Sequence, residues 1–200
     1  MKIQYQKIEN GLEILRIWQD SGIIKVPEQI EGIPVIRIAP YTFSLHKDEE
    51  EKNASVYQTE TGEEDDRFAQ PEELCCGGMV REIHLPSTVQ SIGNYAFYGC
   101  MNLKLFHGTD AIVRMGSGVF TGCRLEKVEI GVKCFSRSEE GVFEVSECNK
   151  LKSVRMGNGC CVHWREFVMK DCGVEEVRIG DGCFVSCEKT VFESECCCVK

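Results

Sequence analysis

Residues 80–106 read VREIHLPSTVQSIGNYAFYGCMNLKLF. Apolar side chains recur along this stretch at short, regular intervals, at Val80, Ile83, Leu85, Val89, Ile92, Ala96, Phe97 and Cys100. The following residues, LKLFHGTDAIVRMGSGVFTGCRLEKVEI (103–130), repeat the plan, with Phe120 and Cys123 standing 23 residues after Phe97 and Cys100. The chain is therefore predicted to consist of repeated units.

The repeat continues to the end of the chain. Phenylalanines recur at positions 97, 120, 143, 167 and 192, and a cysteine follows each of them at positions 100, 123, 148, 172 and 196. Between them, LEKVEI (125–130), LKSVRM (151–156) and VEEVRI (174–179) share the pattern apolar-x-x-apolar-x-apolar. The phenylalanines are spaced by 23 to 25 residues, and this spacing is the length of one coil. A single coil of this length cannot bury its apolar edge alone, so neighbouring coils must stack. The pattern predicts an elongated β-rich solenoid.

Residues 85–103, LPSTVQSIGNYAFYGCMNL, resemble the unit of BspA-like leucine-rich-repeat proteins, L-P-x-x-V-x-x-I-G-x-x-A-F-x-x-C-x-x-L. VPEQIEGIPVIRIAPYTF (26–43) is similar to a first unit, with Val26–Pro27 standing where Leu85–Pro86 stand later. The resemblance covers most of the chain and weakens after residue 130. It implies a right-handed, β-rich leucine-rich-repeat solenoid with little helix. It also implies a bacterial surface or secreted protein linked to adhesion and protein binding, with no shared catalytic residues.

We expect one domain over residues 1–200. Residues 1–20 are predicted to form an N-terminal β-hairpin cap, because Asn10–Gly11 separates two alternating segments and both residues tolerate positive φ. Residues 21–43 would form the first repeat, 44–78 an acidic insertion, and 79–200 about five repeats.

The predicted insertion carries most of the net charge. It holds eleven acidic residues against Lys47, Lys52 and Arg67, which is −8 of the chain's −9. Like charges at this density favour a solvated segment. Contact with a basic partner and a cation site are the alternatives, although the alternation of acids around a glycine that EF-hand loops use is missing.

The fourteen cysteines are interpreted mainly as reduced structural thiols. Five follow the phenylalanines, and Cys134, Cys160 and Cys183 form a second column at the place that Val89 holds in the best unit. A thiol can replace a small buried apolar side chain. Zinc is the alternative, but no pair of C-x-x-C motifs exists. We predict no metal and no cofactor. The roles of six cysteines stay open, namely Cys75, Cys76, Cys161, Cys187, Cys197 and Cys198.

The candidate binding surface is the outer side of the repeated strands, expected to be concave. Its residues should stack into two columns, because neighbouring strands lie about 4.8 Å apart. The predicted binding residues are Lys25, Glu82, His84, His107, Lys127, Glu129, Arg155, Glu176 and Arg178. His84, His107 and Glu129 could instead hold a metal. We favour a mixed polar surface for a protein or glycan ligand. Nucleic acid is disfavoured, since a basic stripe is missing.

Catalysis is not expected. The four histidines are few, and the closest approach to a thiol–base pair is His163 near Cys160 and Cys161, without an evident acid to orient it. The runner-up function is a self-associating scaffold or intracellular interaction protein. In that reading the C-terminal sequence VFESECCCVK leaves the last coil uncapped and open to a homo-oligomer.

The sequence does not decide the protein's location. The family resemblance suggests the cell surface or secretion, whereas MKIQYQKIENGLEILRIW (1–18) lacks the features of a signal peptide and the cysteine usage suits a reducing cytosol. No apolar run approaches the ~18 residues of a membrane span.

Overall fold

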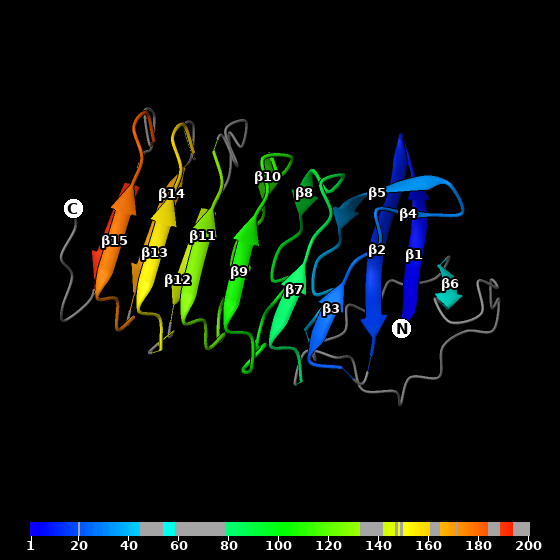
Figure 1. The fold of residues 1–200 in the computed structure, drawn as a ribbon, viewed down its shortest axis with the longest axis horizontal. Helices are drawn as coiled ribbons and strands as arrows, with labels where there is room; N and C mark the ends of the chain where they lie inside the picture. Colours follow the sequence, from blue (N-terminus) through cyan, green and yellow to red (C-terminus); the bar gives the residue numbers. More distant parts are fainter. Residues whose placement is uncertain are drawn as a thin grey trace.

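The computed structural model describes residues 1–19, 21–44, 54–58, 79–132, 142–146, 148, 150–160, 165–170, 172–183 and 189–193. These residues form strands joined by turns, with no helix among them. The strands wind into an elongated stack of coils, with the N-terminal strands at one end and the last described strands at the other (Figure 1). The predicted β-rich solenoid is therefore confirmed.

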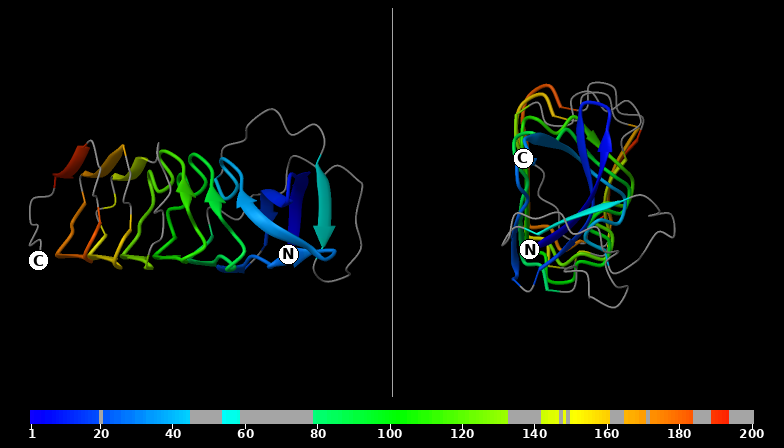
Figure 2. Two further views of the ribbon diagram at one scale, coloured as in Figure 1. Left: turned by 90° about the horizontal axis from the view of Figure 1, so that it is seen from above. Right: turned by 90° about the vertical axis from the view of Figure 1, so that its right-hand side faces the viewer.

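One strand from each coil contributes to a parallel six-stranded sheet, which we call the front sheet. In spatial order it contains β15 (Glu176–Ile179), β13 (Ser153–Met156), β11 (Lys127–Ile130), β9 (Leu105–Gly108), β7 (Glu82–His84) and β3 (Ile23–Lys25). Lys25 pairs with His84, so Val26 follows β3 as Leu85 follows β7. The expected alignment of the first unit with the later ones holds. The sheet runs almost straight in Figure 2, so the expected concavity of its outer side is not confirmed.

The recurrent apolar pattern explains which side of the front sheet is buried. In LEKVEI, Leu125, Val128 and Ile130 face the interior, and their exposed fractions do not exceed 4%. Leu151, Val154 and Met156 repeat the arrangement in the next coil. Side chains alternate across a strand, so the residues between the apolar ones face outward.

A seven-stranded sheet forms a second wall at the N-terminal end. It contains β10 (Arg114–Met115), β8 (Ser91–Ile92), β5 (Ile33–Ile38), β2 (Gly11–Trp18), β1 (Lys2–Ile8), β6 (Ser55–Gln58) and β4 (Gln29–Ile30). β1 and β2 form the predicted antiparallel hairpin, with Asn10 in the turn at φ 70°.

The hairpin is part of this wall, because β2 pairs in parallel with β5 of the solenoid. Its other strand, β1, pairs with β6, which comes from within the predicted acidic insertion. Val56 of β6 is buried. No pattern in the sequence predicted this strand, and the insertion residues around it lie outside the described part of the chain.

A three-stranded parallel sheet replaces the second wall toward the C-terminus. It contains β12 (Val142–Ser146), β14 (Glu166–Lys170) and β16 (Lys189–Glu193). Phe143 pairs with Phe167, as the phenylalanine column predicts. Phe192, however, pairs with Met169, while Thr190 pairs with Phe167. The expected continuation of the column to Phe192 was wrong by two residues, because the spacing from Phe167 to Phe192 is longer than one backbone repeat.

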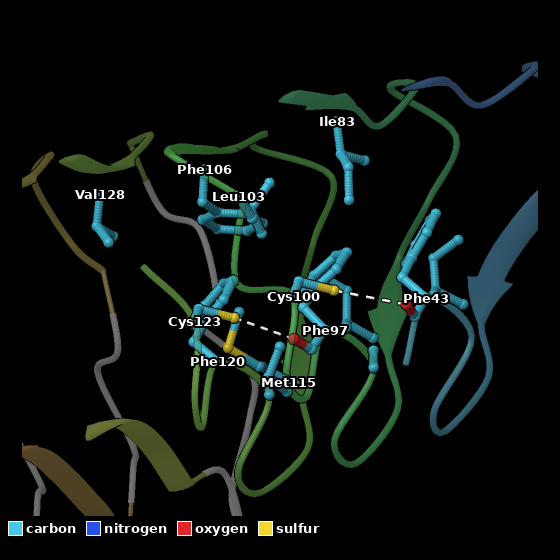
Figure 3. Packing of buried hydrophobic residues seen from close by; sticks show 14 of the residues in the cluster. Phe43, Ile83, Phe97, Cys100, Leu103, Phe106, Met115, Phe120, Cys123 and Val128 are labelled. Atoms are coloured by element: carbon cyan, nitrogen blue, oxygen red, sulfur yellow. Dashed lines mark hydrogen bonds between the residues drawn. The ribbon is translucent and has the colours of Figure 1, made fainter. Parts of the chain in front are cut away.

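The interior is organised by stacked phenylalanines (Figure 3). The Phe97 ring stacks on Phe43 with centroids 5.0 Å apart and on Phe120 with centroids 5.5 Å apart. Phe106 from the front sheet meets Phe120 edge-on at 4.7 Å. All four rings are buried. Ring contacts therefore join three consecutive coils to the front sheet.

A buried arginine fixes the turn beside the first of these rings. Arg16 of β2 is 2% exposed, and its guanidinium donates to the backbone carbonyls of Tyr41 and Ser44 at 2.9 and 2.7 Å. The Thr42 hydroxyl donates to the carbonyls of Ile14 and Ala39. These bonds tie residues 39–44 to β2 and hold Phe43 in the core.

Candidate functional site

The outer side of the front sheet, which we call the ladder face, carries two columns of side chains. The first column contains Lys25, His84, His107, Glu129, Arg155 and Arg178. The second contains Ile23, Glu82, Leu105, Lys127, Ser153 and Glu176. The structure thus brings all nine predicted binding residues onto one surface. Their role in binding stays a prediction.

Polar contacts on the ladder face form both within strands and between neighbouring strands. His84 Nε2 lies 2.8 Å from Glu82 Oε1, and His107 Nε2 lies 3.1 Å from Glu129 Oε2. Lys127 also pairs with Glu129. Because His107 lies in register with Glu129 on the adjacent strand, the Glu129 carboxylate contacts side chains from two coils, whereas the His84–Glu82 contact stays within β7.

The pairing is densest at the C-terminal half of the ladder face. Glu176 lies 2.6 Å from Arg178 Nη2 and 3.7 Å from Arg155 Nη2. A hydrogen bond from Arg178 holds the pKa of Glu176 below its ordinary value. A hydrogen bond from Lys127, helped by the charge of His107, lowers the pKa of Glu129 in the same way. Both carboxylates therefore stay ionised at neutral pH and fix the positions of the cations around them.

The hypothetical metal site on this face receives no support. Glu129 is already engaged by Lys127 and His107, and His84 is bound to Glu82. Within the described ranges, no group of three or more histidine, cysteine, aspartate or glutamate side chains is arranged to hold a metal ion.

Among the described residues, the cysteines that follow the phenylalanines are buried and connect the coils. The thiols of Cys100 and Cys123 donate to the carbonyl oxygens of Phe43 and Phe97 in the preceding coil, at 3.5 and 3.0 Å (Figure 3). Cys148 continues this column by donating to the Cys123 carbonyl at 2.9 Å. The prediction of buried structural thiols agrees with these positions, where all three cysteines are buried and donate hydrogen bonds.

The described thiols of the second cysteine column also donate hydrogen bonds to backbone carbonyls of the preceding coil. The Cys160 thiol donates to the carbonyl of Gly131 at 2.6 Å, and the Cys183 thiol donates to that of Gly157 at 3.2 Å. The sequence analysis treated these cysteines as substitutes for valine. The hydrogen bonds of these thiols were not predicted. Their only signal in the sequence is a cysteine at a position where an aliphatic side chain would fit.

Alkaline pH should destabilise the protein through Cys148. A hydrogen bond with Cys172, burial and the nearby thiol of Cys123 raise the pKa of Cys148 far above its ordinary value. The unfolded thiol ionises above about pH 8.5, so there the unfolded state binds fewer protons than the folded one. We expect the free energy of unfolding to be unaffected by this thiol below that pH. Above it, the free energy should fall by up to about 1.4 kcal/mol per pH unit.

Urea unfolding at a series of pH values checks this expectation. The Cys148→Ala variant is the control, since it lacks the thiol and should show a shallower decline between about pH 8 and pH 10. Identical slopes in the two proteins would contradict the assignment.

Several residues named in the sequence analysis lie outside the described part of the chain, so the structure does not bear on their roles. They are Cys75, Cys76, Cys134, Cys161, His163, Cys187, Cys196, Cys197 and Cys198, together with most of the acidic insertion and the C-terminal residues 194–200. In the described residues, no helix is long and apolar enough to cross a membrane.

Comparison with known proteins identifies the repeat. The profile of the BspA type leucine rich repeat region matches residues 72–196 in six copies. Among solved structures, the leucine rich repeat protein of T. pallidum is similar, with 20% identity, a TM-score of 0.47 and coverage of 89% of this chain and 83% of that one. No curated protein matches the sequence. The matched repeats span more than half of the 200 residues, and the chain belongs to the BspA type leucine-rich-repeat family.

Proposed function

We propose that the protein is a non-catalytic module that binds another protein through the ladder face. The observation that carries the proposal is the pair of registered columns, which present polar and charged side chains from six strands on one continuous surface. Leucine-rich-repeat solenoids serve as protein-interaction or scaffold modules, and stacked coils create broad surfaces of this kind. Adhesion is the biological setting that the family resemblance suggests.

The composition of the face favours a protein over a glycan as ligand. The two columns contain no tryptophan, tyrosine or phenylalanine on which a sugar ring could stack. They offer ammonium, guanidinium, imidazole and carboxylate groups instead. Such alternating charges determine register and partner choice at protein interfaces.

Site-specific photo-cross-linking tests the proposal. A photoreactive amino acid replaces Ser153, which lies near the middle of the C-terminal half of the ladder face. The matched control places it at Arg114, which is exposed on the N-terminal sheet. In the native cells we expect a discrete cross-linked protein from position 153 and not from position 114.

The cross-linked protein is then purified and its affinity for the unmodified chain is measured. Ser153→Trp should weaken binding, because the indole obstructs the face without entering the core. Equal cross-linking from both positions, or unchanged affinity of the tryptophan variant, would show that the ladder face is not the binding surface.

A further inference from the structure

The ladder face exposes its cations more than its carboxylates. In the ion pairs at its C-terminal half, Arg178 is 60% exposed over a Glu176 that is 30% exposed, and Lys127 is 40% exposed over a Glu129 that is 25% exposed. Arg155, at 50%, also stands above Glu176. Arginine and lysine side chains are longer than glutamate, so they reach past the acid that holds them. A partner that approaches this surface therefore meets positive groups first.

The recessed carboxylates act as positioning residues. The Lys127 ammonium beside Glu129 and the Arg178 guanidinium beside Glu176 lower the pKa of each carboxyl. Glu129 contacts Lys127 and His107, and Glu176 contacts Arg155 and Arg178. A guanidinium has five N–H donors, so one contact to a glutamate leaves others available to a ligand. Arg155 and Arg178 stand side by side in one column on adjacent strands.

The charge of the whole face supports a negatively charged partner. Together with the edge row where the strands begin, the described face carries seven lysine or arginine side chains: Lys25, Arg81, Lys104, Lys127, Lys152, Arg155 and Arg178. Against them stand five glutamates: Glu82, Glu126, Glu129, Glu175 and Glu176. This excess of cations occurs in a chain whose net charge is −9.

We propose that the surface around Lys127, Arg155 and Arg178 binds an acidic polypeptide segment of the partner protein. This inference rests on the proposed function and adds the chemistry of the partner. A polypeptide can place carboxylates opposite the three cations and neutral residues opposite Glu129 and Glu176. Nucleic acid fits less well, since it carries a charge about every 1.7 Å of duplex, which the interleaved glutamates and the acidic chain repel.

Fluorescence anisotropy of the full chain with a labelled peptide of alternating glutamate and serine tests the inference. We expect binding that weakens as salt is raised, and no binding of the matched peptide with glutamine in place of glutamate. R155Q/R178Q should weaken binding by roughly tenfold. R155K/R178K, which keeps both charges, should retain part of the affinity and show that the loss does not come from unfolding.

The matched control is R37Q/R114Q, which makes the same change of charge on the N-terminal sheet, where both arginines are exposed and register with Ser91. It should leave peptide binding unchanged. An equal loss in both double variants would overturn the inference, because only net charge would then matter. So would an RNA homopolymer that binds as tightly as the peptide and depends on the same arginines.

The outcomes separate this inference from the proposed function. If the acidic peptide fails to bind while Ser153 still cross-links a partner, the ladder face binds a protein of different chemistry and only the inference is wrong. If neither the peptide nor the cross-linked partner is found, the proposed function fails as well.

Discussion

Replacing Phe97 with alanine should destabilise the protein by about 3–5 kcal/mol. The Phe97 ring is fully buried and lies between Phe43 and Phe120, nearly parallel to both at 18° and 8°. Phe106 also contacts it, with centroids 6.1 Å apart. Removing this ring leaves a cavity shared by three coils, and the loss is a large part of the ~5–15 kcal/mol that stabilises a typical domain.

Urea unfolding followed by circular dichroism measures the change. Met101→Ala is the control, because that side chain is 58% exposed and only four residues away, and it should change the free energy of unfolding by less than about 0.5 kcal/mol. A small loss for Phe97→Ala, comparable with that of the control, would mean that the stacked rings do not hold the coils together. If the alanine variant does not fold, Phe97→Leu, which keeps an apolar side chain in the cavity, should fold with reduced stability.

The parts of the fold that follow from periodicity could be read from the sequence. The spacing of 23 residues between Phe97 and Phe120 predicted the stack of coils, and Val26–Pro27 correctly marked the first coil. The columns of the ladder face followed as well, because side chains alternate along a strand and parallel strands in successive coils place equivalent positions side by side.

The features that depend on contacts between non-equivalent residues could not be predicted. Arg16 is buried and donates to the carbonyls of Tyr41 and Ser44, a contact that no spacing in the sequence indicates. The strand Ser55–Gln58 is surrounded by acidic sequence, and its pairing with the edge of β1 has no signal in its own residues. Phe192 was misplaced because the repeat length changes between the last coils, which spacing alone does not reveal.

The sequence predicted which residues lie on the ladder face, but not which charge is more exposed there. The alternation of charges along Lys127, Glu129 and Glu176 suggested a mixed surface. Which charge dominates depends on how far each side chain extends, and this required the structure. The expectation from sequence was a protein or glycan ligand, and the greater exposure of Arg155 and Arg178 over Glu176 supports our proposal of an acidic segment.

The glycine of the Ile–Gly pair in the repeat has a role that the motif alone did not explain. An added Cβ at Gly93 would lie 2.4 Å from the backbone nitrogen of Pro40 and 2.7 Å from the carbonyl carbon of Ala39. At Gly116, one coil later, it would lie 2.5 Å from the backbone nitrogen of Asn94. At these positions the backbones of successive coils meet directly, and no side chain can fit between them.

Gly93→Ala should therefore cost about 3 kcal/mol, at the upper end of overpacking effects. The clash is with backbone atoms, which cannot rotate away as a side chain can. Relieving it requires the two coils to separate where the Gly93 amide donates to the Ile38 carbonyl at 2.8 Å and the Tyr41 amide donates to the Asn94 carbonyl at 3.2 Å. Equilibrium unfolding in urea gives the loss of stability, and amide hydrogen exchange shows whether these two bonds open.

Gly32→Ala separates this packing effect from the general effect of replacing a glycine. Gly32 has φ +78° and no atom within 4 Å of an added Cβ, so its substitution introduces backbone strain alone, at about 1 kcal/mol. Gly93 is not in that left-handed region, and an alanine there meets the neighbouring coil without that strain. Equal losses from the two substitutions would show that the coils can move apart at little cost. A clearly larger loss at Gly93 would show that the solenoid depends on direct backbone contact between its coils, which explains why the repeat uses glycine after its isoleucine.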